Sequence, residues 1–157
     1  QSSYTFHGFS MIELILIMVM LGIFASMALT RTNTGLSIIK ERIAIDQITS
    51  DVDLVRSMAF GKHDTITIVF STAQESYTIF QGPNGSRTQI DDFPNSDNGT
   101  IVLDNVALRD VNLKTVNFGG ANELQFLPMG EPKHGGTIVL NSRSILIDSV
   151  TGRWSIE

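Results

Sequence analysis

The stretch that decides the fold is HGFSMIELILIMVML, residues 7–21, in which one carboxylate, Glu13, stands at the start of a long apolar run. Residues 14–30 carry no charged side chain. As a helix at about 1.5 Å per residue, residues 11–29 would be roughly 28 Å long, close to the ~30 Å hydrocarbon core of a bilayer. We therefore predict a transmembrane helix over 9–30, in which Glu13 is the unusual feature.

Small residues, which let a neighbouring helix approach closely in lipid, occupy the second half of this run: Gly22, Ala25, Ser26 and Ala28. Two alternatives compete with a packed transmembrane helix. A secretory signal peptide could be cleaved near residues 26–28, but its first part should be basic and only His7 precedes the run. A plain signal anchor accounts for the length but leaves Glu13 as a cost of about 2.5–3.5 kcal/mol if it lies deep in the membrane.

The composition separates the first thirty residues from the rest. The chain has 157 residues, 42% hydrophobic and 17% charged, which is enough to bury the core of one domain with an appendage. All 11 Lys and Arg residues lie at or beyond Arg31. The net charge of −5 gives no general basic surface for nucleic acid, and the absence of cysteine excludes disulfides and thiolate metal sites.

A second, amphipathic helix is predicted over about 36–60. Apolar residues recur there at helical spacing and form one stripe: Ile38, Ile45, Ile48, Val52, Val55 and Ala59. Four polar residues lie off the stripe: Lys40, Glu41, Gln47 and Asp51. The stripe is too short for a coiled coil, so we expect it to pack on a sheet.

The connection between the two helical segments is poor helix material. Residues 30–35 (TRTNTG) combine β-branched residues with Asn33 and Gly35. We expect a kink or a melted turn there.

Beyond Gly61 the apolar period changes to two, which is typical of strands. Residues 65–70 and 77–80 are β-rich runs joined by the polar segment STAQES, and they predict a hairpin. Further short strands are expected over 101–103, 113–117, 124–126, 137–140, 144–148 and 153–156. Residues 82–99 form the longest irregular region. The predicted fold class is therefore α+β: a long N-terminal helix packed on an antiparallel sheet formed by residues 65–157.

The residues around Glu13 resemble a known processing site. GFSMIEL, residues 8–14, followed by an uncharged apolar run, is similar to the cleavage motif of type IV pilins and pseudopilins. In that family a prepilin peptidase cuts after the glycine and methylates the new N-terminus. The resemblance implies that residues 1–8 are a leader, that cleavage falls between Gly8 and Phe9, and that Phe9 becomes N-methylated.

The same resemblance implies a role for Glu13 in assembly. A neighbouring helix in a filament would bring its Phe9 amine into the same apolar bundle. An amine and a carboxylate buried together cost less free energy than either buried alone. Glu13 would then fix the register between subunits, as isolated buried polar groups do in helical assemblies.

The end of the chain carries a second resemblance. Residues 124–156 are similar to the end of minor pseudopilins of the type II secretion H type and of FimT-like minor pilins. The matching residues belong to a turn and a closing Thr-Gly-Arg: Phe126, Pro128, Gly130, Thr151, Gly152 and Arg153, with Leu127 as one extra residue. FimT-like DNA receptors have a further basic residue after Gly-Arg, whereas Ser155 occupies the position two past Arg153 here.

DNA is therefore not an expected partner. Arg153 and Trp154 are the candidates for a DNA contact, because Trp154 could stack on a base. No basic patch surrounds them in the sequence, and DNA binding requires phosphate neutralisation by several cations.

Catalytic and metal sites are not indicated. There is no Gly-x-Ser-x-Gly motif, and His63 and His134 are too few for an expected transition-metal site. Asp91, Asp92 and Asp97 could supply oxygen ligands to calcium, but they lack EF-hand spacing, and a solvated acidic loop is the preferred interpretation. We expect no enzyme activity and no cofactor.

The resemblance implies a minor pseudopilin, a structural subunit of the type II secretion pseudopilus involved in protein export. The alternative is a minor type IV pilin for pilus assembly, adhesion or DNA uptake. The implied partners are other pilins or pseudopilins in a filament, the prepilin peptidase, the inner membrane and exported protein cargo. The implied location is the bacterial inner membrane, crossed once, with the head (31–157) in the periplasm or outside the cell.

Overall fold

The computed structural model describes residues 10–103, 105 and 108–157, and the side chains of all of these except 28–34. The chain divides into two compact units, Gln1–Ser37 and Ile38–Glu157. The second unit is called the head below. Every residue of the described buried apolar cluster lies between Ala44 and Ile147, inside the head. The head therefore has a complete core of its own and can fold without the first 37 residues.

One helix, α1 (Met11–Lys62), occupies the first part of the described chain. The melted turn that we expected at 30–35 is wrong, because α1 stays helical through these residues. The alternative that we gave for the same place, a kink, stays a prediction. Gly35 costs about 1 kcal/mol relative to Ala. Interrupting an established helix would leave up to four carbonyls and four N–H groups without helical partners at the break. The low helix propensity of these residues therefore costs less free energy than the loss of helical hydrogen bonds would.

Nine strands follow α1 in the described residues: β1 (Ile66–Ser71), β2 (Ser76–Gln81), β3 (Thr88–Gln89), β4 (Thr100–Val102), β5 (Thr115–Phe118), β6 (Glu123–Phe126), β7 (Gly136–Val139), β8 (Ser144–Ile147) and β9 (Trp154–Ile156). They form two sheets. The first sheet has the order β3-β2-β1-β6, with β4 also paired to β2, and the second has the order β5-β7-β8-β9. All of these pairings are antiparallel.

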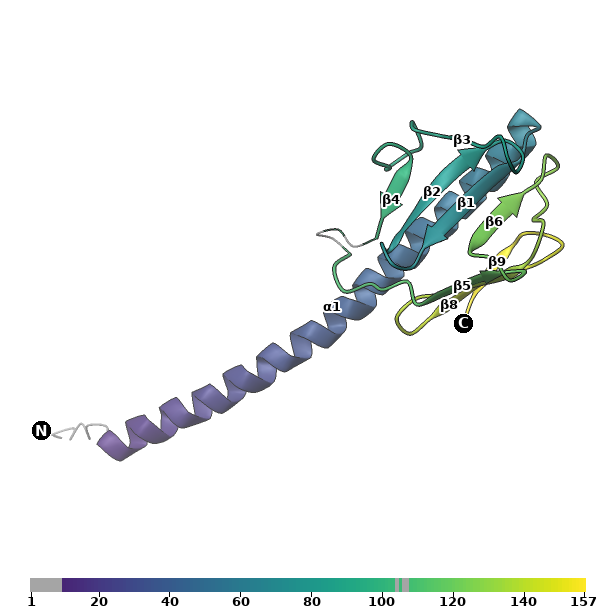
Figure 1. Ribbon diagram of the computed structural model, residues 1–157. Helices are drawn as coiled ribbons and strands as arrows, with labels where there is room; N and C mark the ends of the chain where they lie inside the picture. The colour runs from purple at the N-terminus through teal and green to yellow at the C-terminus, as the bar shows by residue number, and fades with distance from the viewer. Residues whose placement is uncertain (1–9, 104, 106–107) are drawn as a thin grey trace, which may run out of the picture. The chain divides into compact units, whose positions relative to one another are not determined.

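The fold class is confirmed, and the structure adds two features. The hairpin of β1 and β2 forms as predicted, with Phe70 opposite Tyr77. The sequence predicted one sheet, whereas there are two. The sequence analysis also missed β3, a polar strand that pairs with β2. This strand has two residues, which are too few to show a period. Figure 1 shows the first sheet lying across the C-terminal part of α1 and β6 facing the second sheet.

The helical stripe packs as expected. Its members from Ile45 to Ala59 are at most 1% exposed, and Ala44 joins them. Ile38 is an exception, because 56% of its surface is exposed. The buried residues from Ala44 to Ala59 pack with both sheets in one core, in which Phe70 lies near Tyr77 and Phe118.

Two acids of α1 that lie off the stripe are buried, which the sequence did not predict. Glu41 is 3% exposed and accepts hydrogen bonds from the Ser142 N–H at 2.7 Å, the Ser142 hydroxyl at 2.6 Å and the Arg143 N–H at 3.1 Å. Its carboxylate thus holds the turn between β7 and β8 on α1. Burial alone would raise the pKa of Glu41, but the hydrogen bonds and the charge of Arg143 together lower it.

For Asp51, the effect of burial on the pKa outweighs the effect of its hydrogen bond. It is 6% exposed, and Oδ2 accepts a hydrogen bond of 2.5 Å from the Tyr77 hydroxyl. Burial raises the pKa of Asp51, and the bond from Tyr77 offsets only part of this. The pKa of Tyr77 is also raised, first by burial and then by the neighbouring Asp51 charge. Folding therefore favours the protonated form of Asp51 relative to the unfolded chain.

We predict that Glu41→Gln lowers the free energy of unfolding of the head by about 1–3 kcal/mol, because the amide cannot satisfy all three donors. Because the folded pKa of Glu41 is lowered, its contribution is present above the unfolded pKa near 4.5 and is lost as the pH falls through the folded value. Urea unfolding from pH 3 to pH 7 measures both effects. Asp46→Asn, on the exposed face of α1, is the matched control. Equal stability of the two variants at pH 7 would contradict the assignment.

We predict that Asp51→Asn is at least as stable as the wild type at pH 7, because the amide oxygen still accepts the Tyr77 hydroxyl without a buried charge. The folded pKa of Asp51 is raised, so its contribution is present below the unfolded pKa near 3.8 and is lost as the pH rises through the folded value. The variant should gain on the wild type over that pH range in thermal unfolding. A loss at pH 7 as large as that of Tyr77→Phe would refute this reasoning.

Candidate assembly site

The first turn of α1 places Glu13 where a helix favours an anion. Ser10 precedes the helix, and its carbonyl accepts the N–H groups of Glu13 at 3.0 Å and Leu14 at 3.2 Å. Serine is a preferred N-cap, and Ser-x-x-Glu is the pattern of a capping box. This pattern was readable in the sequence but was missed. The helix dipole offsets part of the free energy that burial of the Glu13 carboxylate would cost.

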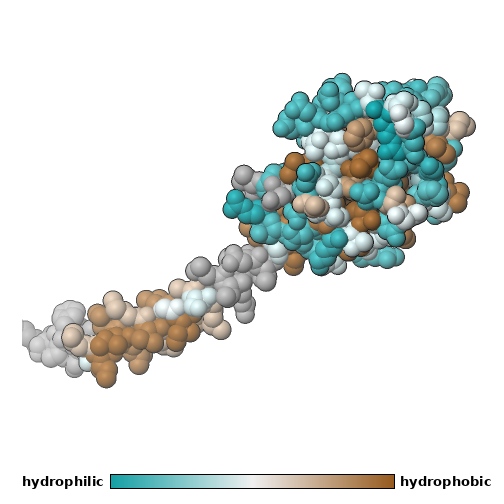
Figure 2. Space-filling model, in the orientation of Figure 1, coloured by the Kyte–Doolittle hydropathy of each residue, from teal (hydrophilic) through white to brown (hydrophobic). Residues whose placement is uncertain are grey.

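Glu13 begins a helical segment whose apolar side chains are exposed on every face. Thirteen large apolar residues between Met11 and Met27 are 43% to 82% exposed. Figure 2 shows them as a continuous hydrophobic band along this part of α1. Soluble proteins rarely expose an apolar surface of this extent unless it is an interaction site. This segment has few polar side chains, and Glu13 is the one charged residue between Met11 and Met27.

The processing motif lies partly outside the described residues. The leader 1–8, and with it Gly8, is outside them, as is Phe9. Among the residues that are described, no helix is long and apolar enough to cross a membrane.

The C-terminal motif acts as a packing device. Gly152 has a φ of 64°, and a Cβ there would lie 3.1 Å from Phe126 Cε1 and 3.2 Å from Pro132 Cδ. Gly130 has a φ of 82°, and its carbonyl accepts Arg56 Nε at 3.2 Å. The motif thus joins the turn after β6 to the turn before β9 and to α1. Its glycines are needed for close approach and for a left-handed backbone.

The two candidates for DNA contact, Arg153 and Trp154, lie at the start of β9, close to this motif. The indole N–H of Trp154 donates to Asp53 Oδ2 on α1 at 2.9 Å, and Arg153 lies next to it with an exposed side chain. In the turn before β9, Asp148 Oδ1 accepts three hydrogen bonds from Val150 and Thr151, which lower the pKa of Asp148. Two carboxylates therefore lie close to Arg153 and Trp154, an arrangement that disfavours a phosphate backbone.

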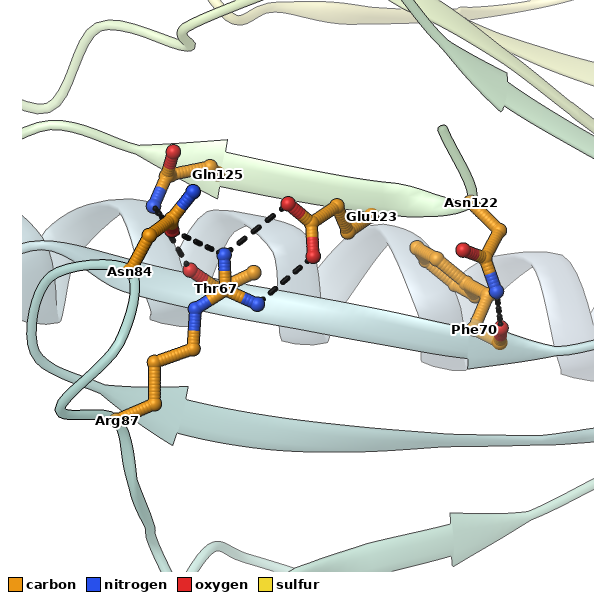
Figure 3. A network of polar contacts seen from close by, with 7 residues as sticks. All are labelled: Thr67, Phe70, Asn84, Arg87, Asn122, Glu123 and Gln125. Carbon is orange, nitrogen blue, oxygen red and sulfur yellow. Dashed lines mark hydrogen bonds and ion pairs between the residues drawn. The ribbon is translucent and has the colours of Figure 1, made fainter. Parts of the chain in front are cut away.

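A polar cluster on the first sheet was not predicted, because its members come from distant segments (Figure 3). Arg87 binds Glu123 through two contacts, Nη1 to Oε2 at 2.7 Å and Nη2 to Oε1 at 3.0 Å. Nη2 also donates to Asn84, whose oxygen accepts Gln125 Nε2 at 2.9 Å. Gln125 Nε2 in turn reaches the Thr67 hydroxyl at 3.3 Å.

This cluster fastens the loop after β2 onto β1 and β6. The hydrogen bonds and charge of Arg87 lower the pKa of Glu123, and those of Glu123 raise the pKa of Arg87. Because its contacts join the loop after β2 to β1 and β6, we assign the cluster a structural role.

The calcium candidates do not form a site. Asp91 and Asp92 line a surface hollow together with Lys62 and Asp64, whereas Asp97 lies outside it and its N–H bonds the Thr100 carbonyl at 2.9 Å. Within the described part of the chain, no three His, Cys, Asp or Glu residues are placed to hold a metal ion.

Comparison with known proteins gives one family. Residues 44–155 match the model of the family described as type II transport protein GspH. No curated protein sequence matches the chain.

Solved structures of a minor pseudopilin and of a minor pilin have a similar fold. The minor pseudopilin EpsH from the type 2 secretion system of Vibrio cholerae aligns with a TM-score of 0.57 at 11% identity, over 74% of this chain and 94% of that chain. A crystal structure of the same pseudopilin gives 0.58 at 10% identity, over 75% and 95%. The type IV minor pilin FimU of Pseudomonas aeruginosa PAO1 gives 0.52 at 16% identity, over 74% and 87%.

Proposed function

Because the chain belongs to the family of type II transport protein GspH, we propose that it is a minor pseudopilin, a structural subunit of a filament that takes part in protein export. Its partners in that filament are other pseudopilins. The observation that carries this proposal is the exposed apolar surface between Met11 and Met27, which begins at one carboxylate. A surface of this kind is suited to assembly with other helices or lipid and not to chemistry on a substrate.

The proposed anchor is the segment 9–30, which crosses the inner membrane once and leaves the head in the periplasm. The absence of charge from 14 to 30 supports this proposal. Cleavage by the prepilin peptidase between Gly8 and Phe9 would free the amine of Phe9 for methylation. Exported protein cargo would contact the head or its neighbours.

Glu13 would act as the register-fixing group of the anchor. At the centre of a transmembrane helix a lone carboxylate costs about 2.5–3.5 kcal/mol, and Glu13, near the start of the segment 9–30, would carry part of that cost. The Phe9 amine of a neighbouring subunit would neutralise it and remove most of that cost. Because other alignments of the apolar helices offer no such partner, the pair would select one axial register.

A minor type IV pilin is the alternative, and the likeness of fold to FimU is what favours it. The arrangement of Arg153 and Trp154 beside Asp53 does not favour the DNA-uptake form of this alternative. In the native host, deletion of the gene separates the two functions: loss of protein export supports the pseudopilin, and loss of pili with intact export supports the pilin.

We predict that Glu13→Gln abolishes incorporation into filaments while the helix and the head stay folded. Gln at this position can still serve in a capping box, so the variant removes the charge and keeps the local helix start. Glu13→Asp, which keeps the charge, should retain part of the assembly. Crosslinking to neighbouring subunits in isolated filaments measures incorporation, and circular dichroism of the full chain in detergent measures folding.

The matched control for assembly is Asp46→Asn on the exposed face of α1 in the head, which should assemble as the wild type does. Normal incorporation of Glu13→Gln would show that Glu13 serves only the start of the helix.

We predict that the mature protein begins with N-methylated Phe9. Mass spectrometry of the N-terminal peptide from the native host measures the mass directly, and a strain without its prepilin peptidase should keep residue 8 attached. A mature N-terminus near residue 29 would instead indicate cleavage of a secretory signal peptide and exclude the proposed anchor.

A further inference from the structure

The chain contains two Asn-Gly pairs, residues 84–85 and 98–99. Asparagine in such a pair can lose ammonia without an enzyme, because glycine has no Cβ to obstruct its backbone nitrogen. The nitrogen attacks the asparagine Cγ, an N–Cγ bond forms and the Cγ–Nδ2 bond breaks, and ammonia leaves with the proton of the backbone N–H. Water then opens the cyclic imide to aspartate or to isoaspartate, in which the backbone runs through the side chain.

The fold protects the second of these pairs. Gly99 is buried directly before β4, and its N–H, whose nitrogen would attack, donates to the Ser96 hydroxyl at 3.1 Å. The Gly99 carbonyl accepts the Ile79 N–H of β2 at 3.3 Å. The Asn98 amide donates to the Asp97 carboxylate at 3.2 Å, and this charge opposes the negative charge that attack would create on the Asn98 oxygen.

The first pair lies in the exposed loop after β2. A hydrogen bond of 3.1 Å from the Ser86 N–H to the Pro83 carbonyl closes a turn around it. Apart from its chain neighbours, no atom lies within 4 Å of the place that a Cβ on Gly85 would occupy. Among the described residues, no hydrogen bond holds the Gly85 N–H. The turn can therefore rotate until this nitrogen meets Cγ of Asn84.

The side chain of Asn84 stays in place during this rotation, because its oxygen has two donors. Arg87 Nη2 and Gln125 Nε2 both donate to Oδ1, the latter at 2.9 Å (Figure 3). When a nucleophile attacks Cγ, negative charge develops on this oxygen. Donors that already point at the oxygen, one of them cationic, stabilise that charge as an oxyanion hole does. The contacts that fasten the loop therefore also activate the amide.

We propose that Asn84 is a site of spontaneous deamidation through a cyclic imide with Gly85, and that Arg87 and Gln125 polarise the reacting carbonyl. The reaction replaces a neutral amide by a carboxylate and so makes the net charge of −5 more negative by one. The new carboxylate competes with Glu123 for Arg87, and isoaspartate lengthens the backbone of the loop. This chemistry concerns the head alone and does not depend on the proposed assembly through α1.

Incubation of the head, residues 38–157, at pH 8 and 37 °C tests the proposal. Trypsin releases the two pairs in separate peptides, 63–87 and 88–109, and mass spectrometry follows the replacement of NH2 by OH in each. We expect Asn84 to react about tenfold faster than Asn98 in the folded head, and both to react at rates within a few-fold in guanidinium chloride, where the fold no longer protects either pair. Equal rates in the folded head, or a faster rate at Asn98, would overturn the proposal.

A second variant tests the activation. Gln125→Met removes one donor to Asn84 and keeps the length of a side chain that is 6% exposed. The rate at Asn84, divided by the rate at Asn98 in the same sample, should fall about tenfold. Thr67→Val removes the other contact of Gln125, at 3.3 Å, without touching Asn84, and should leave this ratio unchanged. A ratio that stays constant or rises in Gln125→Met would show that the cluster only restrains the loop and would refute the activation.

Discussion

The packing of one stripe of α1 into the head is the constraint on which the rest of the structure depends. Residues from Ala44 to Ala59 present a continuous apolar surface, and both sheets close on it. The head is a small domain, and without this stripe each sheet would expose one apolar face to water. The same helix begins at Met11, and the large apolar side chains between Met11 and Met27 are exposed. One covalent element therefore supplies both the core of the head and the surface proposed for assembly.

The buried acids show how both sheets are held on this helix. Glu41 uses its carboxylate to satisfy the N–H groups of a tight turn, which leaves the charge well solvated by dipoles. Asp51 meets a single hydroxyl and stays electrostatically unfavourable as an anion. Glu41 has three donors and the charge of Arg143, whereas Asp51 is more deeply enclosed and has one donor, so their pKa shifts have opposite signs. The β7–β8 turn is thus fastened by a charge, and β2 by a hydrogen bond.

Sequence reasoning recovered the parts of this fold that have a period. The stripe of α1 and eight of the nine described strands repeat at helical or strand spacing, and each was predicted within a few residues. It failed where three-dimensional contacts decide the outcome. The burial of Glu41 depends on a turn one hundred residues away, and the polar cluster around Arg87 depends on the meeting of three segments. The extra helical turns at 30–35 follow from cooperativity, which a propensity scale does not contain.

The candidate sites divide in the same way. Glu13 was identified because a charge at the start of an apolar run is an exception that needs no partner to be visible. The C-terminal motif was identified by resemblance, and the structure gives it a physical explanation: Gly130 and Gly152 permit turns that bring Phe126 and Pro132 into contact with the start of β9. Residues that permit turns indicate the fold of the chain and do not identify a ligand. Arg153 follows directly from this packed turn and has an exposed side chain next to the edge strand β9.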